Sequence, residues 1–210
     1  MKVSNYEIES RAKPPLDTQS HNGFNNGEEH HGLGRAILIF FLAMVTMLFA
    51  GFTSAYVIRS SAIDWKPIPM PGIVWFNSII LILSSFTFEI TSRLYRKGIF
   101  SRWPVILTLF FGIVFFIGQI ILYKKLMAMG IYVATNPHSS FLYILSALHI
   151  IHFSAGIIWL LILVINSLKD YKAISSNALF NCRIYWHYFT ILWLYLVFLL
   201  FIFKISIEIF

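Results

Sequence analysis

Five long apolar segments constrain this chain more than any other feature of its sequence. They cover residues 36–58, 74–91, 104–123, 141–167 and 185–203, with polar or charged stretches between them. Each is close to the ~20 residues that an α-helix needs to cross the hydrocarbon core of a bilayer. Lipid offers no partner for an exposed backbone N–H or C=O group, so an isolated spanning segment must be helical. The sequence therefore predicts an all-α integral membrane protein, a five-helix bundle.

The composition argues against a water-soluble globule. Hydrophobic residues make up 58% of the chain and charged residues only 12%, about half the charged share that is usual in soluble domains. The net charge of +7 does not indicate a nucleic-acid partner, because the basic residues lie between apolar segments and form no basic face. The single cysteine, Cys182, can form no disulfide within the chain and gives no metal-site spacing.

The polar N-terminal segment differs from the rest of the chain. Residues 1–33 are rich in Gly, Asn, Glu and His and poor in aliphatic side chains, which predicts a flexible polar tail. No apolar core or cleavage site of a signal peptide follows Met1. Residues 34–210 form the second part, the five-transmembrane-helix domain. The role of the histidine-rich tail, including His30 and His31, stays open.

The lysine and arginine residues predict the orientation in the membrane. Eleven lie before the first apolar segment and in the loops after the second and fourth, which share one side of the membrane, and five lie on the opposite side. Cytoplasmic loops carry the excess of these residues. We therefore expect a cytoplasmic N-terminus and a C-terminus outside.

Polar and small residues inside the apolar segments indicate possible sites, because the bilayer penalises polar groups. Glu89 is the only acid within such a segment and lies one helical turn before Arg93. It is either an interfacial acid paired with this arginine or a proton-collecting carboxylate. Small residues at helical spacing let another backbone approach closely, which predicts helix-packing positions at Gly51, Ser54, Ala55 and Gly156.

Three histidines, His149, His152 and His187, lie in the last two apolar segments. They leave three possibilities open: axial ligands of a b-type haem, ligands of a non-haem metal, or hydrogen bonds between helices and to lipid head groups. No carboxylate lies at a matching depth in these segments. We expect the third possibility, with no catalytic, cofactor-binding or metal-ligating residue in the chain. The predicted lipid-binding or interhelical polar contacts are Gln119, His149, His152, Trp186 and His187.

Five motifs together resemble subunit III of the haem-copper terminal oxidases, the class of the cytochrome c and quinol oxidases. The resemblance covers about residues 34–203. In order, the motifs are FLAMVTMLFAGFTSAYVIR (residues 41–59), LILSSFTFEI (81–90), IGQIILY (117–123), SALHIIHFSAG (146–156) and YWHYFTILWLYLVF (185–198). The resemblance implies the short five-helix bacterial form of this subunit.

The resemblance also implies a function. Subunit III is a non-catalytic accessory component of a proton-pumping aerobic oxidase in the respiratory chain. It stabilises subunit I, binds phospholipid, and supports proton uptake and oxygen access. The haems and copper are expected in partner subunits and none in this chain. Subunit I is the expected main contact, with subunit II and small or supercomplex subunits as further partners. The expected location is the bacterial cytoplasmic (inner) membrane, crossed in multiple passes.

Three acids of the family pattern are absent. Met44 and Val45 stand where many relatives carry a buried glutamate, Leu122 ends the Gln-x-x-Glu pattern, and Thr190 replaces an aspartate. A role that needs a buried carboxylate at these positions is therefore in doubt. Cytochrome c is the expected electron donor, with a quinol as the alternative. A more remote alternative is a free-standing membrane haem or metal protein that uses His149, His152 and His187.

Overall fold

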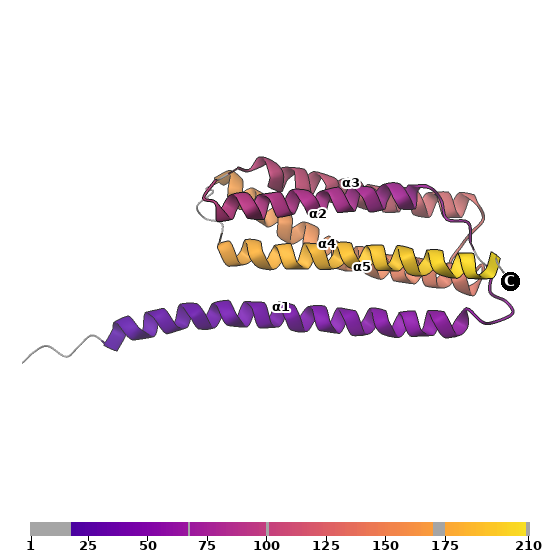
Figure 1. Cartoon of the computed structure of the whole chain (residues 1–210), viewed down its shortest axis with the longest axis horizontal. Helices are drawn as coiled ribbons and strands as arrows, with labels where there is room; N and C mark the ends of the chain where they lie inside the picture. The colour runs from indigo at the N-terminus through magenta and orange to yellow at the C-terminus, as the bar shows by residue number, and fades with distance from the viewer. Residues whose placement is uncertain (1–17, 67, 100, 170–174, 209–210) are drawn as a thin grey trace, which may run out of the picture. The chain divides into compact units, whose positions relative to one another are not determined.

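The computed structural model describes residues 18–66, 68–99, 101–169 and 175–208, and within these ranges all regular secondary structure is α-helical. The helices are α1 (Thr18–Arg59), α2 (Ile73–Arg96), α3 (Trp103–Ala128), α4 (Pro137–Lys169) and α5 (Ser176–Glu208) (Figure 1). Each contains a stretch long and apolar enough to cross a membrane. The prediction of an all-α membrane protein with five spanning helices is confirmed.

The helices extend beyond the apolar segments that predict them. Helix α2 continues past residue 91 to Arg96, and α5 begins at Ser176, well before Tyr185. Hydropathy marks only the part of a helix that lies in hydrocarbon, whereas backbone hydrogen bonding continues into the head-group region. The extra turns bring Arg93, Arg96 and Arg183 onto regular helices.

Glycines end α2 and α3 in the same way. Gly98 and Gly130 have φ angles of 71° and 72°, a left-handed conformation that glycine adopts without steric cost. After α2, the amide of Ile99 bonds to the carbonyl of Leu94 at 3.0 Å, and after α3 the amide of Ile131 bonds to the carbonyl of Leu126 at 3.0 Å. These bonds satisfy carbonyl groups that a helix end otherwise leaves free.

Helices α2, α3, α4 and α5 form a closed four-helix arrangement. Helix α2 packs against α3 and α5, and α4 packs against the same two helices (Figure 1). Large side chains fill the interior, among them Phe88, Phe115, Phe153 and Trp186, each at most 1% exposed. Such packing replaces the hydrophobic driving force that helices lack inside a bilayer.

From Leu38 onward, α1 contacts the other helices through its side chains and through the backbone carbonyl of Leu42, which accepts a hydrogen bond from the Tyr188 hydroxyl at 3.4 Å. From Leu38 to Arg59, no Cα atom comes within 8 Å of another described helix. Its buried residues follow a 3–4 spacing along one stripe, namely Leu38, Leu42, Val45, Phe49 and Tyr56. The Tyr188 hydroxyl lies 2.8 Å from Oγ1 of Thr46, and the Tyr195 hydroxyl donates to Oγ1 of Thr53 at 3.1 Å.

Removing these two hydroxyl groups is expected to loosen α1. The double variant Tyr188→Phe/Tyr195→Phe keeps both rings and deletes the interhelical hydrogen bonds of both hydroxyl groups, including the long one from Tyr188 to the carbonyl of Leu42, and such bonds are each worth on the order of 0.6 kcal/mol in a membrane protein. We expect a loss of about 1 kcal/mol in the free energy of unfolding, measured by titration with sodium dodecyl sulfate in mixed micelles. Tyr132→Phe, at an exposed tyrosine after α3, is the control. Equal losses in both variants would contradict an anchoring role.

The chain divides into two units, Met1–Ile37 and Leu38–Phe210. In the first unit the described structure is the N-terminal part of α1, which begins at Thr18, inside the range 1–33 predicted as a flexible tail. Residues 1–17 lie outside the described residues. The flexibility of the tail, the boundary near residue 34 and the orientation in the membrane stay predictions.

Candidate functional site

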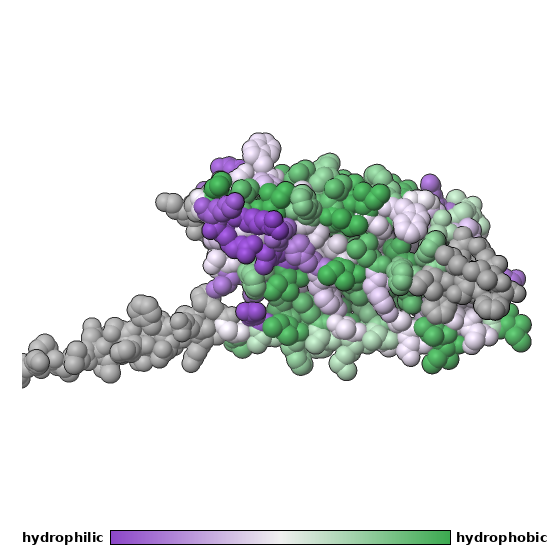
Figure 2. All heavy atoms as spheres, in the orientation of Figure 1, coloured by the Kyte–Doolittle hydropathy of each residue, from purple (hydrophilic) through white to green (hydrophobic). Residues whose placement is uncertain are grey.

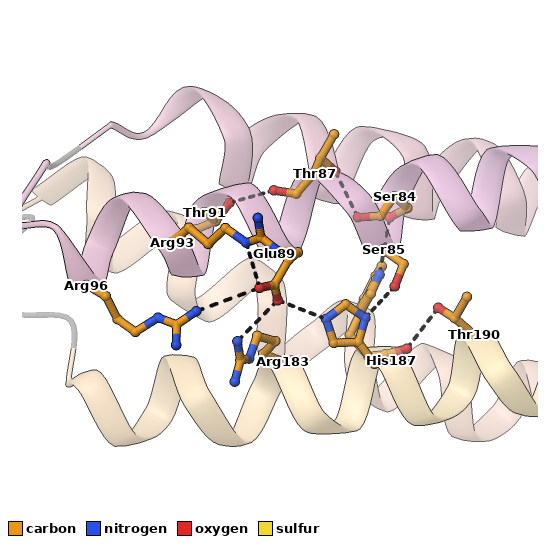
Figure 3. Close-up of polar contacts among 11 residues, drawn as sticks. Ser84, Ser85, Thr87, Glu89, Thr91, Arg93, Arg96, Arg183, His187 and Thr190 are labelled. Carbon is orange, nitrogen blue, oxygen red and sulfur yellow. Dashed lines mark hydrogen bonds and ion pairs between the residues drawn. The ribbon is translucent and has the colours of Figure 1, made fainter.

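Glu89 lies at the centre of a charged cluster between α2 and α5 (Figure 3). Its Oε1 accepts a hydrogen bond from Nε of Arg93 at 3.0 Å and lies 3.7 Å from Nη2 of Arg96. Its Oε2 accepts from Nη1 of Arg183 at 3.1 Å and lies 3.6 Å from Nε2 of His187. The pair with Arg93 matches the spacing in the sequence, whereas the partners from α5 were not predicted.

The charges in this Glu89 cluster do not balance. Among the described residues, three guanidinium groups meet one carboxylate, which leaves an excess of two positive charges when His187 is neutral. The Arg183 side chain is only 16% exposed, and that of Glu89 is 26% exposed. Partial burial weakens solvent screening, so this pair interacts more strongly than an exposed surface pair. The cluster joins α2 to α5.

One sequence signal pointed to the missing partners. Arg183 and His187 are four residues apart, so they lie on the same face of a helix. This signal was hidden because the apolar segment begins only at Tyr185, which left Arg183 in a predicted loop. A basic residue just outside one apolar segment is therefore a candidate partner for an acid within another apolar segment.

Hydroxyl groups of α2 bond to the rings at the start of α5. The Ser85 hydroxyl forms a hydrogen bond with Nδ1 of His187 (Figure 3). The indole N–H of Trp186 donates to Oγ of Ser84 at 3.2 Å. Further along, the indole of Trp193 donates to Oγ of Ser78 at 3.1 Å. Trp186 and His187, two of the predicted polar contacts, therefore both connect α5 to α2.

His149 and His152 have different surroundings, although they are neighbours on α4. His149 is fully buried, and its ring centroid lies 5.3 Å from that of Trp193. His152 donates from Nδ1 to the carbonyl of Leu148 on its own helix at 2.7 Å. The backbone carbonyl of His152 accepts the Tyr185 hydroxyl at 2.6 Å, which ties α4 to α5. Among the described residues, no group of three or more His, Cys, Asp or Glu side chains is arranged to hold a metal ion.

Gln119 and Asn77 are also fully buried. No described protein group forms a hydrogen bond with their side-chain amide atoms, nor with either ring nitrogen of His149. Buried polar atoms of this kind usually bond to protein or to ordered water. Roles of Gln119 and His149 in lipid binding or in helix contact stay predictions.

The small residues fall into two groups. Gly51, Ser54 and Ala55 lie on the exposed side of α1, so a packing role for them requires a neighbour other than the described residues of this chain. Gly156 lies against α5, since a Cβ atom there would be 2.9 Å from Cε1 of Tyr185. Gly118 was not among the predicted packing positions, yet it lies against Asn77 of α2. An ideal Cβ atom at Gly118 would be only 2.1 Å from Oδ1 of Asn77.

The comparisons with known proteins agree with the motifs. No protein-family model matches the chain. A probable cytochrome c oxidase subunit 3 of Mycobacterium tuberculosis is 28% identical over 165 residues, 74% of this chain and 81% of the relative. Cytochrome c oxidase subunit 3 of Synechocystis is 28% identical over 205 residues, 89% of this chain and 85% of the relative. A probable quinol oxidase subunit 3 of Staphylococcus saprophyticus is 26% identical over 128 residues, 59% of this chain and 63% of the relative. The resemblance to subunit III is confirmed.

Proposed function

We propose that this chain, a homologue of the subunit 3 proteins of cytochrome c oxidases, is the accessory subunit III of a proton-pumping aerobic terminal oxidase. The observation that carries the proposal is the similarity to the relatives from Mycobacterium tuberculosis and Synechocystis, which extends over most of both chains. Five helices able to cross a membrane support it.

The chain itself is non-catalytic, and the haems and copper lie in partner subunits. The polar contacts of α2 and α5 support a structural role for these side chains. Glu89 bonds to Arg183, Ser84 to Trp186, and Ser85 to His187. These contacts hold helices together. Subunit I is the main partner and subunit II a further one. Many large apolar side chains are exposed, including Phe40 (69%), Met47 (77%) and Phe110 (57%), and they supply surface for lipid and for partner helices.

Lipid binding, and support for proton uptake and oxygen access in subunit I, are further parts of the proposal. The excess positive charge of the Glu89 cluster favours acidic lipid. The location is a bacterial cytoplasmic membrane, because the relatives are bacterial proteins. With the cytoplasmic N-terminus that the basic loops predict, the ends of α2 and α4 and the start of α5 face the cytoplasm.

The electron donor is cytochrome c in this proposal, since two relatives that cover 89% and 85% of this chain are cytochrome c oxidase subunits. A quinol oxidase is the second candidate, favoured by the relative from Staphylococcus saprophyticus over a shorter stretch. Oxygen consumption by the purified complex distinguishes the two, with reduced cytochrome c and then a reduced quinol as the donor.

Purification through an affinity tag on this chain tests the assignment. In mild detergent we expect large haem- and copper-bearing subunits to co-purify in fixed proportion. The chain expressed alone should show no Soret band, and His149→Ala should leave the haem content of the complex unchanged. A stoichiometric Soret band from the isolated chain would overturn the assignment and favour the free-standing haem protein.

A further inference from the structure

Three polar side chains inside the bundle formed by α2 to α5 have no hydrogen-bond partner among the described residues. They are Asn77 of α2, Gln119 of α3 and His149 of α4, and each is 0% exposed. A buried polar group without a partner is costly, so such groups almost always bond to protein or to ordered water. The three side chains therefore mark a site whose ligand is not a described residue of this chain.

Contacts between the helices place these side chains at one level of the bundle. Asn77 lies against Gly118, the residue before Gln119. Phe115 lies one turn from Gln119 on the same face of α3, and its ring centroid is 6.0 Å from that of His149. Asn77, Gln119 and His149 thus come from three helices and form one layer, which we call the polar layer.

Trp193 of α5 closes the polar layer on its fourth side. Its indole N–H donates to Oγ of Ser78, the neighbour of Asn77, at 3.1 Å. Its ring centroid lies 5.3 Å from that of His149 and 5.2 Å from that of Phe115. Because Trp193 is 3% exposed and Phe115 is fully buried, these rings separate the polar layer from the surface of the bundle.

A cavity of about 20 Å³ lies between the four helices, beside the polar layer. Trp193, Val74 and Ser146 are part of its lining, and the last two precede Asn77 and His149 by one helical turn. Helical side chains lean toward the N-terminus of their helix, so Asn77 and His149 lean toward this cavity. About 10–15 Å³ is enough room for one water molecule. The rest of the lining is mostly apolar, so a bound molecule belongs at the side that faces the polar layer.

The polar atoms require a ligand that both donates and accepts hydrogen bonds. A neutral imidazole has one N–H donor and one acceptor nitrogen, and each amide has N–H donors and an acceptor oxygen. An anion satisfies only the donors, and a cation satisfies only the acceptors. Water does both, and a buried water makes about three hydrogen bonds. The mixed set of donors and acceptors therefore matches water.

The distribution of charge also argues against an ion. No Asp, Glu, Lys or Arg lies within one helical turn of Asn77, Gln119 or His149 along the sequence. On the face that Figure 2 shows, hydrophilic residues gather at the end of the bundle where α2 ends, beside a largely apolar surface. An ion in the polar layer would lack a compensating charge, which is costly inside a bilayer. The small cavity excludes a larger organic molecule.

We propose that Asn77, Gln119 and His149 form an internal water site that links α2, α3 and α4. Bound water supplies partners for both amides and for the two ring nitrogens of His149. The inference concerns contacts within the chain, so it does not depend on the proposed function. It goes beyond that function by assigning a ligand to buried residues of two different motifs.

Infrared difference spectroscopy of the purified complex tests the site. The spectrum of Gln119→Met, which keeps the length of the side chain, is subtracted from that of the unmodified protein. We expect the difference to contain an O–H stretching band that shifts in water labelled with the heavy oxygen isotope, which identifies it as a water band. His149→Phe should lose the same band. Leu122→Met, at another buried position of α3, is the matched control and should keep it.

A high-resolution density map of the complex locates the ligand. We expect density for water within hydrogen-bonding distance of Asn77, Gln119 and His149, and its loss in Gln119→Met and His149→Phe. Direct hydrogen bonds among the three side chains, with no density between them, would overturn the proposal. So would a water band that persists in both variants or disappears in the control. Density that strengthens when rubidium replaces sodium would show a cation and overturn the assignment to water.

Gel filtration of each variant identifies failures of folding. If Gln119→Met does not fold, His149→Phe decides the matter, and if neither folds, the map of the unmodified protein decides it. If the chain proves not to co-purify with haem-bearing subunits, the proposed function fails. The same infrared spectra can then be recorded on the full chain alone in nanodiscs.

Discussion

Gly118→Ala is expected to destabilise the protein, although alanine normally favours a helix. An ideal Cβ atom at this position lies 2.1 Å from Oδ1 and 2.8 Å from Cγ of Asn77. Asn77 is fully buried, so its side chain cannot swing into solvent. Extra atoms in a well-packed interior cost about 1–3 kcal/mol. We expect a loss of this size in the free energy of unfolding in mixed micelles, with a matching loss of the subunit from the oxidase on heating.

Gly51→Ala is the matched control for this variant. Gly51 is also a glycine within a helix, but no heavy atom of a described neighbour lies within 4 Å of its ideal Cβ. We expect Gly51→Ala to be neutral or stabilising by up to ~1 kcal/mol, the usual gain from replacing glycine in a helix. The double variant Asn77→Ala/Gly118→Ala should recover part of the loss, because it removes the clashing amide. Equal behaviour of Gly118→Ala and Gly51→Ala would show that α2 and α3 are not closely packed here.

Apolar length predicted the fold well, because a bilayer leaves a long apolar segment no alternative to a helix. Hydropathy did not locate the helix ends, since the turns that carry Arg96 and Arg183 lie among head groups. It also could not identify which glycines approach another helix. Gly51 and Gly118 both lie among apolar residues, yet only Gly118 faces a neighbouring helix. Which face of a helix contacts another depends on the arrangement of all the helices, and spacing within one segment does not contain that information.

The candidate site was predicted in part. Glu89 stood out as the one acid within an apolar segment, and its bond to Arg93 follows from helical spacing. Its contacts with Arg183 and His187 of α5 join residues 94 and 98 positions apart in the chain, which no local pattern encodes. The absence of the acids of the family pattern at Val45, Leu122 and Thr190 put in doubt a role that needs a buried carboxylate at these positions. The structure instead places a carboxylate of α2 beside His187, the histidine of the family motif at the start of the last helix.

Glu89→Gln is expected to weaken the contact between α2 and α5. The change keeps the size of the side chain and removes its charge, so Arg183 loses its carboxylate while remaining only 16% exposed. The three guanidinium groups then repel one another without a central anion. Breaking a fully buried pair costs about 3–5 kcal/mol and breaking an exposed pair at most about 1 kcal/mol. For this partly exposed cluster we expect a loss on the order of 1–3 kcal/mol in the free energy of unfolding in mixed micelles.

Asp64→Asn provides the comparison, because it breaks an ion pair of similar length in a different setting. Asp64 and Arg59 lie 2.6 Å apart, but their side chains are 58% and 45% exposed. Its loss should stay below about 1 kcal/mol and should vanish in high salt, which screens exposed charges. The double variant Glu89→Gln/Arg183→Gln should be less destabilised than Glu89→Gln alone, since it leaves no poorly solvated guanidinium group between the helices. Equal losses in the free energy of unfolding for Glu89→Gln and Asp64→Asn at every salt concentration would show that partial burial does not strengthen the Glu89 cluster. In that case α2 and α5 are held together by their serine–indole hydrogen bonds and aromatic packing instead.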